Sequence, residues 1–210
     1  MGAIAGPDEN QSWAARRQVH TGAMATTPRT DGAMDLQPTL NNAVVRLRPL
    51  VPDDFEALFA IASEPQVWEQ HPSKDRTQRP IFERWFEGAL TSGGALTAIA
   101  LDGHDVVGTS RFENCRPVER EVEIGWSFLA RSRWGGGLNG EIKQLMLDYA
   151  FEHVEAVVFT VHSQNLRSQR AVEKLGAIRT GITVDPQGRG DNHVFRLERS
   201  LRSSAGRSAG

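Results

Sequence analysis

Three consecutive glycines, Gly135–Gly137, stand directly before a segment whose apolar residues recur at helical spacing. Residues without side chains let a phosphate group come close to the backbone. The N–H groups at the start of a helix near Asn139 would point at the same place. Arg131 and Arg133 could add charge-assisted hydrogen bonds to phosphate oxygens. These residue types and their spacing predict a binding site for a pyrophosphate group.

A flexible surface turn is the plain alternative, because glycine runs also occur where no ligand binds. Two common nucleotide-binding motifs fit poorly. A Walker P-loop requires Gly-Lys-Ser or Gly-Lys-Thr, which does not follow these glycines. A Rossmann fingerprint requires an acidic residue suited to a ribose, and none follows the strand-like run Val157–Val161. A nucleotide-binding enzyme is therefore the weaker interpretation.

A second polar segment lies further along the chain, where Asn165 and Ser168 open a predicted helix over Arg167–Leu175. Gly176 is well placed to end that helix in the left-handed conformation. Asn165 could cap the helix, and the Ser168 hydroxyl could donate a hydrogen bond or a proton to a ligand. This segment could close over the rest of a long cofactor.

The segment Glu121–Phe128 precedes the glycines and alternates as a strand does. The alternation assigns Val122, Ile124, Trp126 and Phe128 to one face, and Glu121, Glu123, Gly125 and Ser127 to the other. A carboxylate on the polar face could accept a proton from a bound substrate. A surface glutamate paired with an arginine is the alternative.

The elements that must position these residues follow from the remaining pattern. Strands are expected at 44–48, 96–101, 106–112, 157–161, 178–184 and 192–197, and the second and third form a hairpin through Asp102-Gly103. The order strand, glycine turn, helix, strand predicts a right-handed βαβ unit. We therefore predict an α/β fold with a mixed, mostly antiparallel sheet, one parallel βαβ pair and flanking helices.

Two helices are expected between the first and second strands. Asp53 and Glu56 have the spacing of a capping box for the first helix, and the second begins near Thr77. The domain is expected to span residues 43–200. Residues 1–42 are expected to form a disordered extension and 201–210 a flexible tail, because neither has sustained apolar periodicity.

Composition narrows the class of protein. The formal net charge of −2 gives no basic field for nucleic acid or an anionic membrane. One cysteine provides neither a disulfide framework nor a thiolate cluster for a metal. No apolar run approaches the roughly 18 residues of a spanning helix. The expectation is a cytoplasmic protein that binds no metal, no nucleic acid and no membrane.

The strand, the glycine turn and the second polar segment together resemble the GNAT superfamily of N-acetyltransferases. The branch that they resemble most contains the ribosomal-protein-alanine N-terminal acetyltransferases. The resemblance covers roughly residues 44–199 and is carried by Glu123–Trp126, Trp134–Glu141 and Asn165–Gly176. It implies a GNAT-like fold and acetyl-CoA as co-substrate. Trp134 and Asn139 depart from the wider superfamily, which usually has Gln or Arg and Gly or Ala there.

The resemblance implies cofactor contacts from the backbone near Phe128 and Leu129, from the turn, and from Asn165 and Ser168. The turn residues are Arg131, Arg133, Trp134, Gly135, Gly136, Gly137, Leu138, Asn139 and Gly140. Asn165 would bond the pantetheine arm, or else serve only as a helix cap.

Acetyl transfer to an amine needs a base, stabilisation of the carbonyl oxygen, and a proton for the leaving thiolate. Glu123 is the candidate base, with Glu121 or a water molecule as competitors. Many family members use a tyrosine as the acid, but the aligned residue here is Val172. The resemblance implies that Ser168 takes this role, and a serine bonded to the helix backbone is the alternative.

The implied reaction transfers an acetyl group to a primary amine, on a protein N-terminus or a small molecule, by direct attack in a ternary complex. Trp68 and Trp126 are the candidates for contact with the acceptor, and core packing is the alternative for Trp68. A coenzyme A-binding regulatory module without turnover is the alternative function. The chain is expected to be a monomer or a homodimer.

Overall fold

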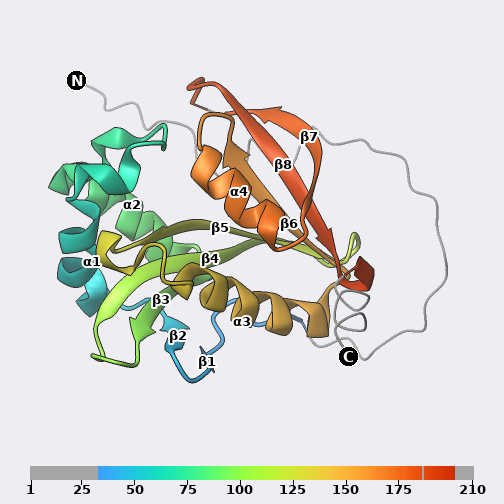
Figure 1. The fold of residues 1–210 in the computed structure, drawn as a ribbon, viewed down its shortest axis with the longest axis horizontal. Helices are drawn as coiled ribbons and strands as arrows, with labels where there is room; N and C mark the ends of the chain where they lie inside the picture. Colours follow the sequence, from blue (N-terminus) through green and yellow to red (C-terminus); the bar gives the residue numbers. More distant parts are fainter. Residues whose placement is uncertain (1–32, 186, 202–210) are drawn as a thin grey trace, which may run out of the picture.

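The computed structural model describes residues 33–185 and 187–201, which build one eight-stranded sheet in the order β1-β2-β3-β4-β5-β6-β8-β7 (Figure 1). The strands are β1 (Leu40–Asn41), β2 (Val45–Pro49), β3 (Ala95–Ala100), β4 (Val106–Arg116), β5 (Glu121–Leu129), β6 (Ala156–His162), β7 (Ile178–Val184) and β8 (Asp191–Glu198). The α-helices are α1 (Phe55–Ala62), α2 (Arg79–Thr91), α3 (Leu138–His153) and α4 (Leu166–Lys174). The 3₁₀ helices are η1 (Pro52–Asp54), η2 (Pro65–Trp68), η3 (Lys74–Thr77) and η4 (Arg131–Arg133). The predicted mixed α/β architecture is confirmed.

Neighbouring strands are antiparallel except β5 and β6, which run parallel with α3 between them in the chain. The predicted βαβ unit and the β3–β4 hairpin are therefore confirmed. The ladder between β5 and β6 extends only from Glu121 opposite Ala156 to Glu123 opposite Val158. Both strands continue beyond this ladder, so they separate and leave a wedge in the sheet.

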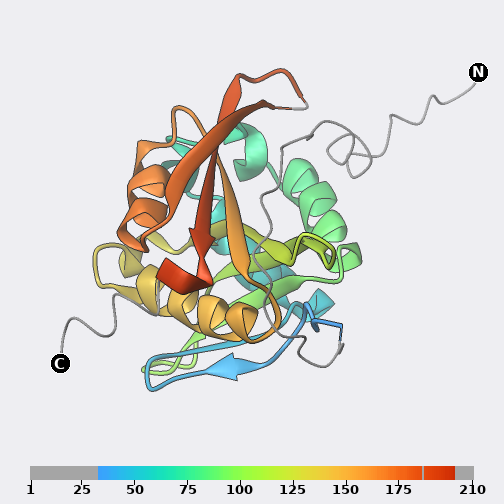
Figure 2. The ribbon, with the colours of Figure 1, turned by 90° about the vertical axis from the view of Figure 1, so that its right-hand side faces the viewer.

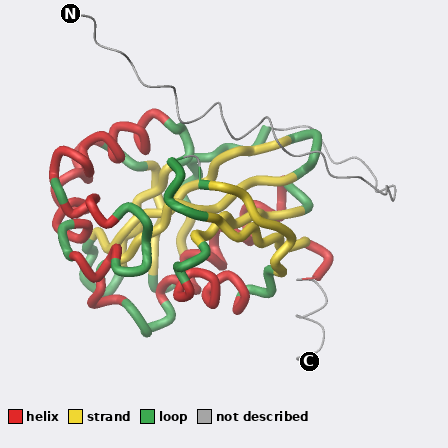
Figure 3. The backbone as a smooth tube through the Cα atoms, turned by 90° about the horizontal axis from the view of Figure 1, so that it is seen from above, coloured by secondary structure: helices red, strands yellow, loops and turns green. Residues whose placement is uncertain are grey.

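The helices cover both faces of the sheet. Figure 2 shows α3 and α4 on one side of the central strands and α2 on the other. Seen from above, α1 and α2 form the left end of the molecule, beside the strands (Figure 3). The wedge between β5 and β6 therefore lies between two helical layers.

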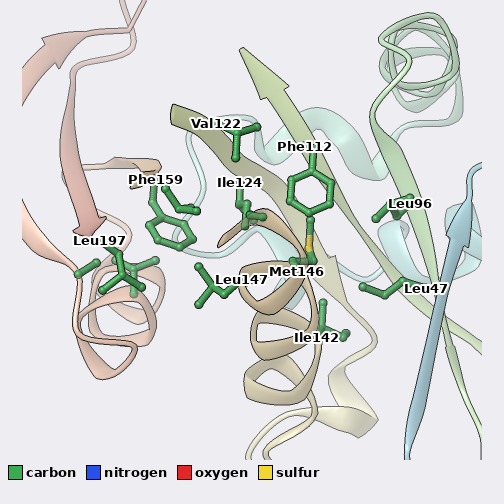
Figure 4. Close-up of a cluster of buried hydrophobic side chains, with 14 of the residues drawn as sticks. Leu47, Leu96, Phe112, Val122, Ile124, Ile142, Met146, Leu147, Phe159 and Leu197 are labelled. Atoms are coloured by element: carbon green, nitrogen blue, oxygen red, sulfur yellow. The ribbon is translucent and has the colours of Figure 1, made fainter. Parts of the chain in front are cut away.

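The larger core lies between α3 and the sheet. Ile142 and Met146 of α3 pack with Phe112 and Ile124 of the central strands, and all four side chains are buried (Figure 4). Helical spacing predicts a stripe of Leu138, Ile142, Leu145, Met146 and Tyr149; Ile142 and Met146 lie on the buried face of α3, whereas the other three are half-buried at its edge. A second core joins α1 and α2 to the other face of the sheet at Phe128.

A β-bulge interrupts β5 and corrects the predicted alternation. Opposite β4, the register shifts between the pair Thr109–Phe128 and the pair Arg111–Gly125. Trp126 has a φ of 50° at this point and is exposed. The extra residue in β5 moves every later side chain of the strand to the opposite face of the sheet. Ile124, before the bulge, therefore packs toward α3, whereas Phe128, after it, packs toward α1 and α2. The prediction that Trp126 and Phe128 share the face of Ile124 was wrong.

The sheet begins earlier than the boundary expected after residue 42. Leu40–Asn41 pairs with β2, and the Tyr149 hydroxyl of α3 donates a hydrogen bond of 2.8 Å to the carbonyl oxygen of Asp35. Residues 33–42 are therefore part of the fold. The rest of the expected extension, 1–32, and residues 202–210 of the expected tail lie outside the described residues.

The predicted capping box of Asp53 and Glu56 was wrong, because α1 begins after Asp54 and the Glu56 carboxylate binds Arg79. Asp54, not Asp53, is buried, and its carboxylate binds Arg48 at 2.6 and 2.7 Å and the Thr97 hydroxyl at 2.6 Å. It also accepts a hydrogen bond from the Val51 N–H, so it fixes the entry into η1 and α1. In the described part of the chain, no helix is long and apolar enough to cross a bilayer.

Candidate active site

A cleft of about 600 Å³ occupies the wedge between β5 and β6 and continues along α2. We name its two ends by the helices that line them. The α3–α4 end comprises Asn139, Lys143, Asn165, Ser168 and Val172. The α2 end comprises Trp68, His71, Arg76, Arg84, Trp85, Arg111, Glu113, Trp126, Asp185 and Arg189. Glu123 and Ile124 of β5 also line the cleft, where the ladder between β5 and β6 ends.

The glycine turn leads directly into α3. Gly135 and Gly137 have φ values of 77° and 82°, which are costly for any residue with a side chain. Gly137 is the N-cap of α3, and within residues 33–185 and 187–201 no side chain caps the helix, so its first N–H groups can bind an anion. Of the other turn residues, Leu138 packs against the core, Asn139 lines the cleft, and Gly136 and Gly140 are exposed.

The arginines and the tryptophan of the turn have distinct positions. Arg133 binds both carboxylate oxygens of Asp102 on the β3–β4 hairpin, at 2.6 and 3.0 Å, whereas Arg131 is exposed. Trp134 donates its ring N–H to the carbonyl oxygen of Leu129 at 3.1 Å. The Arg167 guanidinium lies 3.9 Å from the centre of the Trp134 ring, an interaction that joins α4 to the turn. The sequence indicated Trp134 but not its partner Arg167.

The start of α4 presents Asn165 and Ser168 to the cleft. The buried Asn165 side chain accepts a hydrogen bond of 3.2 Å from the Ser168 N–H, so it caps the helix as one of the two predicted roles requires. The half-buried Ser168 hydroxyl forms no hydrogen bond with another residue that the structure describes. It is therefore able to donate to a ligand.

The two glutamates of β5 have different surroundings. Glu123 lines the cleft where the strands separate, is buried, and accepts a hydrogen bond of 2.9 Å from the Asn114 side-chain amide. Glu121 lies within the paired part of β5, and its carboxylate binds the guanidinium groups of Arg116 and Arg196. The alternative of an arginine-paired glutamate thus describes Glu121.

Lys143 is a buried cation that the sequence analysis missed. Its ammonium group donates to the hydroxyl oxygens of Ser110 and Ser127, at 2.8 and 2.5 Å. Burial lowers the pKa of Lys143 to about 7. The Ser127 hydroxyl also bonds the Gly125 carbonyl oxygen at 3.0 Å, so this lysine supports the bulge of β5. The position of Lys143 beside Ile142, on the apolar side of α3, is the feature of the sequence that could have indicated a buried lysine.

Aromatic side chains dominate the α2 end. The buried Trp68 packs on Phe128, with ring centres 5.2 Å apart, and donates its ring N–H to the Ala62 carbonyl oxygen at 2.7 Å. Most of the Trp68 side chain therefore packs in the core, as the alternative prediction stated, and Trp68 also lines the cleft. Trp126 is exposed, and the Arg111 guanidinium lies 5.1 Å from its ring centre.

His71 and His162 also line the cleft. Burial, and secondarily the positive charges of Arg76 and Arg189, lower the pKa of His71 to about 3. The His71 ring therefore stays neutral and accepts a hydrogen bond of 3.0 Å from the Ser73 N–H. Among the described residues, no group of three or more His, Cys, Asp or Glu side chains is arranged to hold a metal ion.

Known proteins share this fold. Residues 45–178 match the family described as acetyltransferase (GNAT) domain. An uncharacterized N-acetyltransferase, p20, from Bacillus licheniformis is 25% identical over 154 residues, which cover 70% of this chain and 86% of that protein. A GCN5-related N-acetyltransferase from Brucella melitensis has a similar crystal structure, with a TM-score of 0.70 and 23% identity over 78% of this chain and 80% of that one. Mycobacterium smegmatis RimJ, solved in complex with CoA-disulfide, gives a TM-score of 0.62 and 20% identity over 78% of this chain and 87% of that one. The chain belongs to the GNAT family, whose members use acetyl-CoA, and is an acetyltransferase.

Proposed function

We propose that this protein transfers the acetyl group of acetyl-CoA to a primary amine by direct attack within a ternary complex. The observation that carries the proposal is that one cleft is lined by both Glu123 of β5 and Ser168 of α4, where the sheet opens. The cofactor would enter at the α3–α4 end, with its pyrophosphate at the glycine turn and the start of α3. The amine would enter from the α2 end.

Each side chain has one proposed step. Glu123, directly or through a water molecule, takes a proton from the amine, whose nitrogen then attacks the thioester carbonyl carbon. The carbon–sulfur bond breaks as the amide forms, and the Ser168 hydroxyl supplies the proton for the leaving thiolate; Ser168 then regains a proton from water and Glu123 releases its proton to water. Glu121 is not the proposed base, because its carboxylate is already bound by the guanidinium groups of Arg116 and Arg196.

The backbone of β5 offers a donor for the carbonyl oxygen. Ala130 donates its N–H to Val107 of β4, and successive N–H groups of a strand point to opposite edges. The Leu129 N–H therefore points away from β4, on the same edge as its carbonyl, which Trp134 contacts. Of the two predicted positions, Leu129 is the one that we propose as the oxyanion donor.

Calorimetry tests the cofactor site. Acetyl-CoA is expected to bind the wild type, and Gly137→Glu is expected to abolish binding through bulk and negative charge at the turn. Gly93→Glu is the matched control, since Gly93 also has a positive φ, 68°, and open space around it, but lies after α2. Equal loss of binding in both variants, or no binding by the folded wild type, would overturn the cofactor assignment.

Turnover tests the catalytic roles. Glu123→Gln is expected to lower kcat by about 100-fold or more while acetyl-CoA affinity is retained, since general acid–base catalysis contributes roughly 10²–10⁴. Ser168→Ala is expected to lower kcat less, because water can also protonate a thiolate. Glu121→Gln, the neighbouring control, should keep the wild-type kcat per folded molecule. Full turnover by both the Glu123 and Ser168 variants would refute the mechanism.

A further inference from the structure

Arg167, at the start of α4, contacts a segment that lies 97–100 residues earlier in the chain. Its backbone N–H donates a hydrogen bond of 2.9 Å to the side-chain oxygen of Gln70, and its guanidinium donates one of 3.2 Å to the carbonyl oxygen of Val67 in η2. Each segment thus provides one side chain and one backbone group to the other. The bond to Gln70 also satisfies one of the first N–H groups of α4, which have no partner within the helix.

The same guanidinium packs on the glycine turn. It lies 3.9 Å from the ring centre of Trp134, and that ring donates its N–H to the carbonyl oxygen of Leu129 at the end of β5. A guanidinium stacked on an aromatic ring favours a fixed orientation of both groups. Arg167 therefore joins three segments, which are η2, the start of α4 and the turn.

The surroundings of Arg167 strengthen these contacts. The side chain is half-buried, and burial lowers the pKa of Arg167, whereas the Glu69 carboxylate opposes this shift. An arginine side chain nevertheless stays protonated at neutral pH. The guanidinium is therefore a cation in a site that excludes part of the solvent, where its interactions with a carbonyl oxygen and an aromatic ring are stronger than at an open surface.

These contacts cross the open end of the wedge. The turn follows the end of β5 and α4 follows the end of β6, beyond the residues at which the two strands are paired. Ser168, next to Arg167, lines the cleft from α4, and Trp68, next to Val67, lines it from η2. Arg167 thus connects the two sides of the wedge beside the residues that would meet the two substrates.

We infer that Arg167 is a positioning residue for acetyl transfer, which holds η2, with Trp68, in a fixed position relative to the glycine turn and to Ser168. The inference rests on the proposed function, because it requires that the cofactor binds at the turn and that the acceptor meets Trp68. In this role Arg167 touches neither substrate and exchanges no proton. Cofactor binding, by fixing the turn, should then also restrain η2 through Arg167.

Hydrogen exchange with and without coenzyme A tests this link and needs no acceptor. In the wild type, saturating coenzyme A should slow exchange by about fivefold or more in residues 64–72, which include η2, as well as at the turn. In Arg167→Ala, which should still bind coenzyme A, the slowing at the turn should persist and the slowing in residues 64–72 should be lost. Arg170→Ala, at an exposed position on the same helix, removes the same side chain and should behave as the wild type does.

Two further variants and a kinetic measurement separate positioning from a purely structural role. Arg167→Lys keeps a cation near Trp134 and should restore part of the slowing in residues 64–72. Gln70→Ala removes the acceptor of the Arg167 N–H and should weaken the slowing, which keeps the test valid if Arg167→Ala does not fold. With putrescine and the peptide Ser-Ala-Gly-amide as trial acceptors, Arg167→Ala should raise the acceptor KM by about fivefold or more, and Arg170→Ala should not.

The outcomes distinguish the inference from the proposed function. Absence of coenzyme A binding by the folded wild type overturns both. If coenzyme A binds, unchanged exchange in residues 64–72, equal slowing in Arg167→Ala and the wild type, or an unchanged acceptor KM overturns the inference alone. Loss of coenzyme A binding in folded Arg167→Ala also overturns it, since Arg167 would then belong to the cofactor site. If neither trial acceptor turns over, the exchange measurements decide.

Discussion

Lys143 shows how one residue can connect stability to the shape of the cleft. Its ammonium group lies beneath the bulge of β5, held by two serine hydroxyls rather than by a carboxylate. Hydroxyls compensate only part of the solvation that a buried charge loses. The protonated form is therefore unfavourable in the folded state, which accounts for the lowered pKa.

Lys143→Met should stabilise the protein most at acidic to neutral pH. The unfolded chain protonates this lysine at its ordinary pKa of 10.5, and the folded chain only near 7. The penalty is thus complete below pH 7 and disappears as the pH rises toward 10.5. The advantage of the variant in urea unfolding should shrink by about 2 kcal/mol between pH 7 and pH 9. An advantage independent of pH would show that the folded state keeps the ordinary pKa.

His71 should make the protein sensitive to acid. Unfolded histidine takes up a proton near pH 6.5, whereas folded His71 does so only near pH 3. The stability from neutral His71 is complete above pH 6.5 and is lost as the pH falls toward 3. His71→Gln should reduce the decline in unfolding free energy between pH 6.5 and 5 by about 1–2 kcal/mol. His104→Gln, a substitution at an exposed position, should leave this decline unchanged. An equal effect of the two substitutions would contradict the role of His71.

At the scale of elements, local signals explain which parts were predictable. Gly137 and Gly176 both have positive φ at the ends of helices, and apolar spacing marked the buried face of α3. The bulge in β5 was missed because strict alternation was assumed across Gly125, although a glycine inside a strand often marks such an irregularity. The role of Asp54 was missed because its partners, Arg48 of β2 and Thr97 of β3, come from strands that only the fold brings to η1.

Asn165 combines a structural and a proposed functional role, and two substitutions separate them. Asn165→Ala should reduce stability by about 1 kcal/mol, because the cap of α4 is lost. Asn165→Ser should restore most of that stability, since serine also caps helices. If acetyl-CoA affinity stays low in the serine variant, the amide contacts the cofactor. The capping role would be contradicted if the serine variant were as unstable as the alanine variant in urea unfolding.

For the whole molecule, the halves of the sheet on either side of the wedge are joined by few backbone pairs. Glu121 adds a side-chain link, because its carboxylate binds Arg116 of β4 and Arg196 of β8 at the closed end of the wedge. The sequence indicated that β5 and β6 would be parallel neighbours, but not that their pairing would stop so soon. The sequence also could not predict which residues form the α2 end, because its arginines come from distant parts of the chain and come together only in the folded protein.

Glu121→Gln should loosen this junction. The loss of charge leaves two guanidinium groups without their shared carboxylate, and because both are 24–30% exposed the cost should be about 1–2 kcal/mol. Hydrogen exchange should accelerate in β6 and β8 more than in β2 and β3. Glu119→Gln, at an exposed position in the turn before β5, is the control. Equal stability of the two variants would show that the junction does not depend on this carboxylate.

The open wedge also has a consequence for the lifetime of the protein. A ligand that fills it binds the folded chain and not the unfolded one, so under the proposed function acetyl-CoA at 100 times its Kd would add about 2.7 kcal/mol to the free energy of unfolding. When acetyl-CoA is scarce, more molecules unfold and become available to proteases. The abundance of the enzyme would then follow the acetyl-CoA supply, with no dedicated sensor.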